Sequence, residues 1–472
     1  METYAIYAGG DFVHTSEPLT IRNSYTNEVV ATTFLASKNE LEKAIRQAMV
    51  AREAMKQLPS FKRYEILMQI AHELKQERSR LAELLALEAC KPIKYALGEI
   101  DRGIQTFIVA AEESKRLPSE YLSIDWTAAG LGKEAIVRYF PLGIIAGIVP
   151  FNFPLNLAAH KIAPAIASGN CIIIKPARST PISTLELAKI IDKTELPKGA
   201  FSVLPMDRLA GQQLVEDPRI QMLTFTGSPE VGWKMKSQAG KKKITLELGG
   251  NAGVIVTPTA PIDLALQKCL TGAFSYSGQI CIHTQRIYVE RSIFDSFLEQ
   301  FCTAASKLKI GHVLEPDTDI SAMIDEENAI RVEAWINEAV SQGARIACGG
   351  KRHGSVVEPT VLTNTQSSMK VCGLEAFGPV VTIEPYDDFK QAVEQINNSP
   401  YGLQAGVFTN AIDEMNYAFE HVEAGGVIVN DVPTFRVDHM PYGGIKDSGF
   451  GREGVKYAIM EMMEPKIMVK PK

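Results

Sequence analysis

Several features are absent from this 472-residue sequence, and each absence excludes a class of protein. No apolar run reaches the roughly 20 residues that cross a bilayer, and no basic stretch precedes an apolar one at the N-terminus. We therefore expect a cytoplasmic protein with no membrane partner. The net charge is -6, with both signs scattered along the chain, which argues against a nucleic-acid partner. Low-complexity tracts and fixed-period repeats are also missing, and the length predicts two or three globular domains.

Closely spaced cysteine pairs are also missing. The seven cysteines are odd in number and widely spaced, with no Cys-x-x-Cys pair. This spacing argues against both a disulfide framework and a zinc centre, so we expect no metal site. We expect most of the cysteines to be buried, inert thiols and one of them to be reactive.

The N-terminal third predicts short strands followed by helices. β-type runs extend to about residue 31, and Ser37 to Glu40 form a capping box ahead of a helix that stops near Leu58. Apolar residues at helical spacing from 66 to 85 predict a second helix, which ends before Pro92. A polar hairpin follows, with expected strands at residues 124–126 and 135–139.

Short β-rich runs alternate with helices twice along the rest of the chain. This alternation predicts an α/β protein with two domains, each built on a parallel sheet. The helices expected in the second domain include 292–308 and 327–341, and the tail at 467–469 predicts an edge strand. The expected strands are 144–149, 171–175, 201–204, 222–225 and 244–246, then 254–256, 287–289, 361–362, 380–383 and 427–429.

The chain is organised around Cys281. A small-residue run at 271–277 predicts a helix that closes at Gly278-Gln279-Ile280-Cys281, ahead of a strand at 286–289. A cysteine at such a turn can be lifted into a cleft. The segment Gly-Gln-Ile-Cys-Ile-His-Thr-Gln-Arg resembles the nucleophile segment of the aldehyde dehydrogenase superfamily. Within it, the chain is most similar to the non-phosphorylating, NAD(P)-dependent branch that oxidises lactaldehyde, glyceraldehyde 3-phosphate and phosphono- or sulfo-aldehydes.

This resemblance implies a fold and an assembly. It implies a Rossmann-type dinucleotide-binding domain at residues 1–118 and 142–248, followed by a second α/β catalytic domain at 249–440. Residues 119–141 and 455–472 would form a small β oligomerisation arm, and the protein would be a homodimer or homotetramer.

The chemistry of aldehyde oxidation assigns roles to three residues. Hydride transfer first requires a tetrahedral carbon, which the Cys281 thiolate would create by adding to the aldehyde. Asn152, between Pro150 and Pro154, resembles the side-chain donor of the family's oxyanion hole. Glu247, at the end of an apolar strand, resembles the general base that activates water for thioester hydrolysis. Each residue also has a simpler interpretation when it is considered alone. Asn152 would then only stabilise a proline turn, and Glu247 would only accept hydrogen bonds from backbone donors.

The sequence signals for a cofactor site are weaker than those for the nucleophile. Gly449 to Gly454 is the formal Gly-x-Gly-x-x-Gly match, but no βαβ unit surrounds it, and we interpret it as a decoy. Phe225 to Gly232 follows a strand and opens a helix, where backbone N–H groups can face a pyrophosphate. Arg178 stands where the family often has the glutamate that favours NAD, so we expect NADP to be accepted at least as readily as NAD. The expected NAD or NADP contacts are Val149, Pro150, Lys175, Arg178, Arg208, Gly227, Ser228, Gly249, Glu375 and Phe377.

Four polar residues lie where the family's substrate funnel would be: Arg102, His160, His283 and Arg436. Each by itself suits a surface or capping group, but two arginines and a histidine that converge suit a carboxylate, phosphate or sulfonate. We therefore expect a short aldehyde that carries an anionic group or an α-hydroxyl. The alternatives at this point are a CoA-acylating or phosphorylating dehydrogenase and a catalytically silent, cofactor-binding relative.

Overall fold

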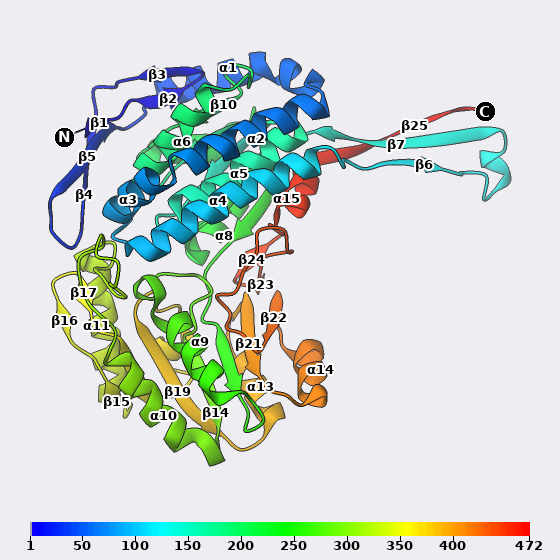
Figure 1. Ribbon diagram of the computed structural model, residues 1–472. Helices are drawn as coiled ribbons and strands as arrows, with labels where there is room; N and C mark the ends of the chain where they lie inside the picture. Colours follow the sequence, from blue (N-terminus) through cyan, green and yellow to red (C-terminus); the bar gives the residue numbers. More distant parts are fainter. Residues whose placement is uncertain (1) are drawn as a thin grey trace.

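The computed structural model describes residues 2–472, which form two α/β bodies and a projecting β arm. In Figure 1 the helix-rich first body lies above the second body, and the arm extends away from both. None of the helices within residues 2–472 is long and apolar enough to span a membrane.

The first body is built on an eight-stranded sheet of order β24-β12-β11-β8-β9-β10-β2-β3. Its five central strands are parallel and almost entirely buried, as the apolar runs in the sequence predict. They are β8 (Ile144–Ile148), β9 (Cys171–Lys175), β10 (Phe201–Val203), β11 (Met222–Thr226) and β12 (Lys243–Glu247). The antiparallel edges are β2 (Ile6–Ala8), β3 (Asp11–Val13) and β24 (Gly449–Phe450).

Helices surround this sheet. The first helix, α1 (Lys38–Gln57), has the expected capping box between Ser37 and Glu40. The single helix expected across residues 66–85 is wrong, because the backbone at Glu77 leaves the helical conformation (ψ 6°) and divides it. The two pieces are α2 (Ser60–Gln76) and α3 (Arg78–Ala89), and the body is completed by α4 (Ile93–Ser114), α5 (Pro154–Ser168), α6 (Ile182–Asp192), α7 (Arg208–Glu216), α8 (Pro229–Gln238) and α15 (Val455–Glu461).

The second body has a seven-stranded sheet of order β15-β18-β19-β14-β13-β21-β22, which is parallel apart from β15 at one edge. Its strands are β13 (Gly253–Val256), β14 (Arg286–Glu290), β15 (Arg345–Cys348), β18 (Thr360–Thr363), β19 (Val380–Tyr386), β21 (Gln404–Phe408) and β22 (Gly426–Val429). Its helices are α9 (Ile262–Phe274), α10 (Arg291–Ala305), α11 (Glu326–Ser341), α12 (Lys370–Gly373), α13 (Phe389–Asn397) and α14 (Ile412–His421). The second alternating series in the sequence is thus a separate parallel sheet.

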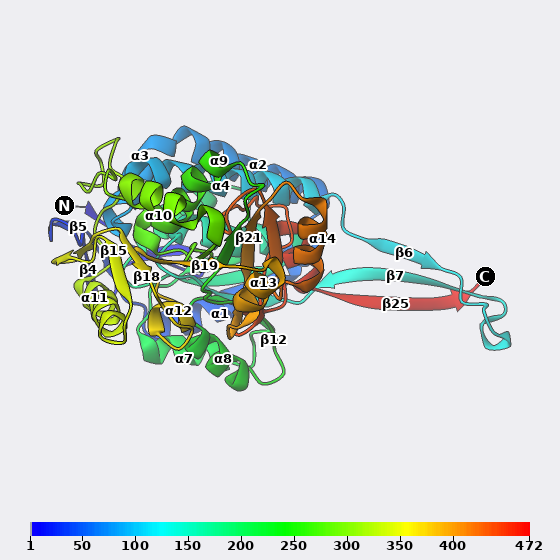
Figure 2. The ribbon, with the colours of Figure 1, turned by 90° about the horizontal axis from the view of Figure 1, so that it is seen from below.

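The arm is a three-stranded antiparallel sheet in which the chain's tail pairs with the hairpin. β25 (Met463–Pro471) runs beside β7 (Lys133–Pro141) along nine residues, and β6 (Ser119–Leu122) covers the other edge of β7. The strand expected at 124–126 is wrong, because these residues form the bend between β6 and β7 and the Trp126 side chain is 90% exposed. Figure 2 shows the arm projecting far beyond both bodies.

Smaller elements complete the chain. Three strands form a separate N-terminal sheet, and two short two-stranded antiparallel sheets and two 3-10 turns lie in loops. They are β1 (Glu2–Thr3), β4 (Pro18–Arg22), β5 (Val29–Phe34), β16 (Arg352–His353), β17 (Val356–Val357), β20 (Tyr401–Gly402), β23 (Ile445–Lys446), η1 (Ala128–Gly130) and η2 (Ser275–Gly278).

Candidate active site

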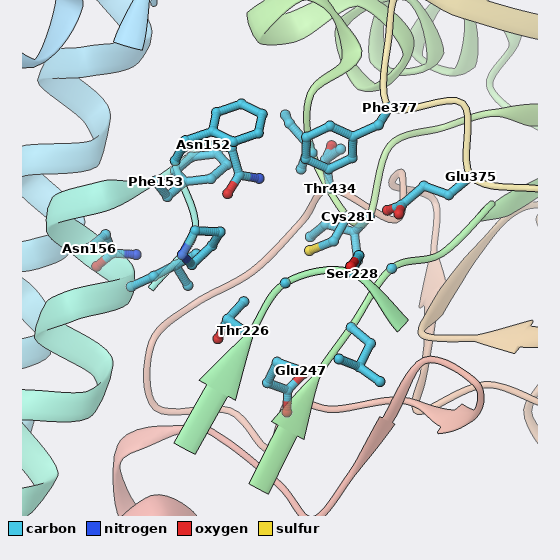
Figure 3. Close-up of a pocket in the computed structure, with 18 of the residues that line it drawn as sticks. Asn152, Phe153, Asn156, Thr226, Ser228, Glu247, Cys281, Glu375, Phe377 and Thr434 are labelled. Atoms are coloured by element: carbon cyan, nitrogen blue, oxygen red, sulfur yellow. The ribbon is translucent and has the colours of Figure 1, made fainter. Parts of the chain in front are cut away.

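A cavity of about 380 Å³ lies where segments of the two bodies meet. Thr226 and Glu247 enter it from the carboxyl ends of β11 and β12, and Cys281 and Glu375 enter it from the second body (Figure 3). The structure brings eleven of the residues singled out in the sequence to this cavity. They are Arg102, Pro150, Asn152, Gly227, Ser228, Glu247, Gly249, Cys281, Glu375, Phe377 and Arg436.

The nucleophile loop owes its shape to unusual backbone conformations. Helix α9 ends at Phe274, three residues earlier than expected, because Tyr276 and Ser277 adopt left-handed φ values of 49° and 52°. Gly278 follows with φ 69°, and a Cβ there would lie 2.1 Å from the carbonyl oxygen of Gly378. The loop therefore presses tightly against the segment that carries Glu375 and Phe377, and it turns Cys281 into the cavity.

The Cys281 thiol has a polar side-chain partner. Its Sγ lies 3.2 Å from the hydroxyl of Tyr442. Burial raises the pKa of Cys281 to about 11, while the hydrogen bond with Tyr442 acts in the opposite direction. Ionisation of this thiol thus depends on what the cavity places around it.

Asn152 lies across the cavity from Cys281, as Figure 3 shows. Its Nδ2 donates to the carbonyl of Gln279 at 2.9 Å, which leaves one amide N–H for a ligand. The backbone N–H of Cys281 has no hydrogen-bond partner within residues 2–472. These two donors provide the components of an oxyanion hole.

A buried lysine fixes the loop that carries Asn152. The Lys91 ammonium donates to the Asn152 carbonyl at 2.5 Å and to the carboxylate of Glu99. The Glu99 carboxylate in turn accepts the backbone N–H groups of Leu155 and Asn156, at 3.0 and 3.1 Å, in the first turn of α5. The ammonium also lies 3.8 Å from the ring centre of Phe153. These contacts hold Asn152 in one orientation.

Glu247 is a buried carboxyl group with no hydrogen-bond partner for either oxygen within residues 2–472. Burial and the negative charge of Glu453 raise the pKa of Glu247 well above its usual value. Burial alone would also raise the pKa of Glu453, but the Lys161 ammonium 2.9 Å away and the Arg436 guanidinium lower it to about 2. The pKa values of these two buried carboxyl groups are thus shifted in opposite directions.

Glu375 and Phe377 line the opposite side of the cavity. The Glu375 carboxylate accepts the Gly250 N–H at 3.1 Å, and burial raises the pKa of this group to about 7. A Cβ on Gly249 would lie 2.1 Å from a Glu375 oxygen, so this glycine allows the close approach. The Phe377 ring stands edge-on to Phe151, with the ring centres 5.7 Å apart. Together they place aromatic rings and a carboxylate side by side on one wall of the cavity.

The cavity continues toward the start of α8 at Gly227 and Ser228. Helix α8 opens with Pro229, and the Ser228 side chain caps none of its N–H groups, as suits a phosphate-binding helix start. A Cβ on Gly232 would lie 2.4 Å from Leu248, so close packing explains this second glycine. The glycine run at 449–454, in contrast, begins on β24, which is antiparallel to β12 and lies outside any βαβ unit.

Four of the expected cofactor contacts lie outside the cavity: Val149, Lys175, Arg178 and Arg208. Val149 donates its N–H to the Lys175 carbonyl at 3.0 Å, at the carboxyl ends of the adjacent strands β8 and β9. Burial and the Arg178 cation lower the pKa of Lys175. Arg178 and Arg208 are exposed nearby, so cationic groups gather at this end of the sheet.

Two arginines line the rest of the cavity. Arg102, from α4, donates to the Asp438 carboxylate at 2.8 Å, and Arg436 lies 3.5 Å from Glu453. The Nε atoms of both arginines are buried without a hydrogen-bond partner within residues 2–472. The guanidinium of Arg436 lies 3.6 Å from the ring centre of Tyr442. Each arginine therefore lines the cavity and leaves one of its donors without a partner within residues 2–472.

The two histidines expected to contact substrate do not line the cavity. His160 is buried behind Arg102, where its Nε2 lies 2.8 Å from the Asp438 carboxylate that also binds Arg102. His283 turns away from the cavity, with its Nε2 2.8 Å from the Ala273 carbonyl, and burial lowers its pKa to about 4. The prediction that His283 contacts the substrate is wrong, because the short turn after Cys281 points the His283 side chain into the second body.

Sequence reasoning missed several polar residues of this region, and three of them make contacts that shape the site. Tyr442 follows Pro441 in a glycine-rich loop, and no motif in the sequence indicates that its ring lies beside the nucleophile. Arg331, on α11, lines the cavity near Glu375 and donates to the Ala376 carbonyl at 2.9 Å. Lys91, directly before Pro92, could have been noticed only as a lysine inside an apolar stretch.

A half-buried cysteine lies with two available N–H donors and a buried carboxyl group beside the carboxyl ends of a parallel sheet, and this set of groups suits an oxidoreductase that works through covalent sulfur chemistry. The comparison with protein families agrees, because residues 12–468 match the aldehyde dehydrogenase family. The chain belongs to this family and is an enzyme that oxidises small aldehydes with NAD(P).

Three similar proteins are informative. A 3-sulfolactaldehyde dehydrogenase of Priestia aryabhattai is 42% identical over 99% of this chain and 98% of its own. The crystal structure of aldehyde dehydrogenase 21 from Physcomitrella patens, in complex with the reaction product succinate, is 45% identical, with a TM-score of 0.98 over 100% of this chain and 98% of its own. The glyceraldehyde-3-phosphate dehydrogenase GapN from Methanocaldococcus jannaschii, complexed with NADP, is 39% identical, with a TM-score of 0.93 over 97% of this chain and 100% of its own.

Proposed function

We propose that this enzyme oxidises a short aldehyde that carries an anionic group to the carboxylic acid, with NAD(P), and that Cys281 is the nucleophile. The observation that carries the substrate class is the pair of arginines in the cavity, each with a buried, unpartnered Nε. Guanidinium groups suit a carboxylate, phosphate or sulfonate through directed hydrogen bonds.

In the proposed mechanism, the Cys281 thiolate adds to the aldehyde carbon. The oxygen becomes an oxyanion between the Asn152 amide and the Cys281 N–H, and each such donor contributes about 3 to 4 kcal/mol in comparable enzymes. A bound nicotinamide would supply the hydride acceptor, and Cys281 would then hold the acyl group as a thioester. Asn152 is held ready for this role by its contacts with Gln279 and Lys91.

Glu247 then acts as the base for hydrolysis. Its carboxyl group has no competing hydrogen bond, and its raised pKa makes it a stronger proton acceptor than an exposed glutamate. A water molecule that gives its proton to Glu247 would attack the thioester and release the acid. This base favours hydrolysis over transfer of the acyl group to a thiol.

The residues present suit a nicotinamide dinucleotide. The aromatic wall at Phe151 and Phe377 suits a planar ring packed against it, the Glu375 carboxylate suits ribose hydroxyls, and the start of α8 suits the pyrophosphate. Lys175 and Arg178 would lie near the adenosine ribose. Because Arg178 adds an exposed cation there, we propose that NADP is used at least as readily as NAD.

The relatives support an anionic substrate. One bears the name of a sulfonated hydroxyaldehyde, and another was crystallised with a dicarboxylate product. In this chain, Arg102 and Arg436 would hold the anion. The amide nitrogen of Asn156, also buried without a partner within residues 2–472 and also lining the cavity, would donate to an α-hydroxyl or a second acid oxygen.

The arm supports an oligomer. Both of its outer strands, β6 and β25, leave an edge open to pairing, and exposed apolar side chains on it include Tyr121, Trp126, Leu131 and Ile467. We propose that a second copy of the chain covers this surface, in a homodimer or homotetramer.

The test is a screen of short aldehydes, charged and neutral, with both cofactors, read by the absorbance of the reduced nicotinamide. Anionic aldehydes should be oxidised with the highest kcat/KM. Arg102→Ala and Arg436→Ala should each raise KM for the anionic substrates by about 10- to 100-fold, and Arg102→Ala should leave neutral aldehydes little affected. Arg116→Ala, an exposed arginine beyond α4, is the matched control. Unchanged kinetics in both cavity variants would refute the anion site, and activity retained by Cys281→Ser would refute the nucleophile.

A further inference from the structure

Tyr442 makes a contact that the mechanism above does not use. Its ring is 3% exposed, it lines the cavity, and its hydroxyl lies 3.2 Å from the Cys281 sulfur. Within residues 2–472 the hydroxyl has no other hydrogen-bond partner. The contact with sulfur is therefore the hydrogen bond that a buried phenol requires.

The direction of this hydrogen bond depends on the charge of the sulfur. When Cys281 is a thiol, either group can donate, but when it is a thiolate only the tyrosine hydroxyl carries a proton. Burial and the neighbouring Cys281 keep the pKa of Tyr442 well above its usual value, so the hydroxyl remains protonated. Tyr442 is thus a permanent donor facing a sulfur that changes charge during the reaction.

Arg436 strengthens the donor. Its guanidinium lies over the Tyr442 ring, 3.6 Å from the ring centre. A cation on the face of a phenol draws electron density from the ring and makes the hydroxyl proton a better donor. The same guanidinium lines the cavity, so one arginine touches both the ring and the space for substrate.

We propose that Tyr442 is a catalytic residue whose hydroxyl donates a hydrogen bond to the Cys281 sulfur each time that sulfur carries negative charge. This role rests on Cys281 being the nucleophile. It applies twice in each turnover, once when the thiolate attacks and once when it leaves.

Each bond that forms in this reaction is matched by one that breaks. The thiol proton passes to water in the cavity, the sulfur electron pair forms the C–S bond, and the carbonyl π pair moves to oxygen. The hydride departs with its electron pair to the oxidised nicotinamide, which leaves the thioester. Water then adds and gives its proton to Glu247, and the C–S pair returns to sulfur as a thiolate. Tyr442 donates to the thiolate at the first and last of these points and itself loses no proton.

The size of the effect follows from the charge on the acceptor. A hydrogen bond to a charged group shifts an ionisation by about one to two pKa units. The thiolate population of Tyr442→Phe at neutral pH would then fall by roughly 10- to 100-fold. Because a more basic thiolate is also more nucleophilic, the net loss of alkylation rate is roughly 3- to 10-fold.

The experiment measures the rate of Cys281 alkylation by iodoacetamide against pH in the full-length protein, with the modified peptide located by mass spectrometry. In Tyr442→Phe the midpoint of the profile should move up by about one to two units. In Tyr276→Phe the midpoint should stay in place. Tyr276 is a buried tyrosine in the loop that carries Cys281, but its hydroxyl donates to the Ala89 carbonyl and not to the sulfur. An unchanged midpoint in Tyr442→Phe, or faster alkylation at neutral pH, would overturn the proposal.

A second variant separates the hydroxyl from the ring. Tyr442→Leu should show the same upward midpoint as Tyr442→Phe, and in addition a higher KM for anionic aldehydes because Arg436 loses the ring beneath it. A normal midpoint in the leucine variant would also overturn the proposal. If complete alkylation of Cys281 left aldehyde oxidation intact, the proposed nucleophile would be wrong, whereas a normal midpoint with full inhibition would be a failure of Tyr442 alone.

Discussion

Glu247 and Glu453 are two carboxyl groups in one buried cluster with opposite ionisation preferences. The pKa of Glu247 is raised by burial and by the charge of Glu453, whereas Lys161 and Arg436 hold the pKa of Glu453 at about 2. One carboxyl group is therefore a permanent anion, and its charge makes the other a better proton acceptor. This division of roles gives the first prediction.

Glu247→Gln should stop turnover after one round. Hydride transfer does not need the base, so we expect a burst of about one reduced nicotinamide per active site, followed by a steady state lowered by roughly 10²- to 10⁴-fold. Stopped-flow absorbance measures both phases. Glu230→Gln, at an exposed position on α8, is the control and should behave as the wild type. A variant with no burst would place Glu247 before the thioester, contrary to the proposal.

The same carboxyl group predicts the acid side of the pH profile. Glu247 must be ionised to accept a proton, so hydrolysis should be lost as pH falls through its raised pKa. The acid limb of kcat for the wild type should therefore lie well above the usual pKa of a glutamate, about 4.3. A limb at or below that value would contradict the raised pKa. The limb is measured under conditions in which hydrolysis limits the rate.

Lys161→Met should destabilise the first body. The Lys161 ammonium bonds Glu453 at 2.9 Å and Thr226 at 2.8 Å, and its removal leaves a buried carboxylate unpaired at a cost of about 3 to 5 kcal/mol. Denaturant unfolding at pH 7 measures this loss. Lys456→Met, exposed on α15, is the control. The double variant with Glu453→Gln should recover part of the lost stability, and no recovery would mean that the cost has another origin.

The Lys161–Glu453 pair also has a pH signature. The pKa of Glu453 is lowered on folding, so its contribution is fully present above the unfolded value near 4.3 and is lost as pH falls toward 2. Stability of the wild type should fall over this acid range. In the Glu453→Gln variant that part of the fall should be absent, and an unchanged acid profile would contradict the assignment.

Arg178→Glu should reverse the cofactor preference. Arg178 is exposed beside Lys175, where a glutamate would repel a 2′-phosphate and accept ribose hydroxyls instead. We expect kcat/KM with NADP to fall by about 10- to 100-fold, with little loss for NAD. Arg46→Glu, on the exposed face of α1, should change neither value. A wild-type enzyme with a strong preference for NAD would refute the role of Arg178.

Charges on the arm should disrupt assembly. Ile467 and Val469 lie on the same face of β25 and are each about half exposed (54% and 49%). Their joint replacement by aspartate should reduce the assembled mass measured by light scattering after size exclusion, because a buried charge opposes the contact. Glu464→Gln on the same strand is the control. An assembly of unchanged mass would show that this face of the arm is free.

The sequence predicts the elements of this fold better than the directions of its side chains. The parallel strands and the α1 cap follow from local apolar patterns and a capping motif, and the structure confirms them. The break at Glu77 and the end of α9 at Phe274 depend on individual backbone angles that apolar spacing does not encode. The prediction of a strand at 124–126 is wrong because β-type residues also occur in bends.

In the candidate site, too, the sequence predicts the residues better than the directions of their side chains. Cys281, Glu247 and Asn152 lie in recognisable motifs, and the structure brings all three to one cavity. His283, two residues from the nucleophile, turns away, because proximity in sequence does not fix orientation in a tight loop. Tyr442 reaches the sulfur from 161 residues farther along the chain, a contact that only the docking of the two bodies creates.

The cavity draws Glu247 from one sheet and Cys281 from the loops of the other, so neither body contains a complete reaction centre. Catalytic competence is therefore a property of how the two bodies dock, not of how well each is folded. A small rotation between them would separate the base from the nucleophile while leaving both parallel sheets intact. Activity should accordingly be a more sensitive reporter of domain alignment than any measure of secondary structure.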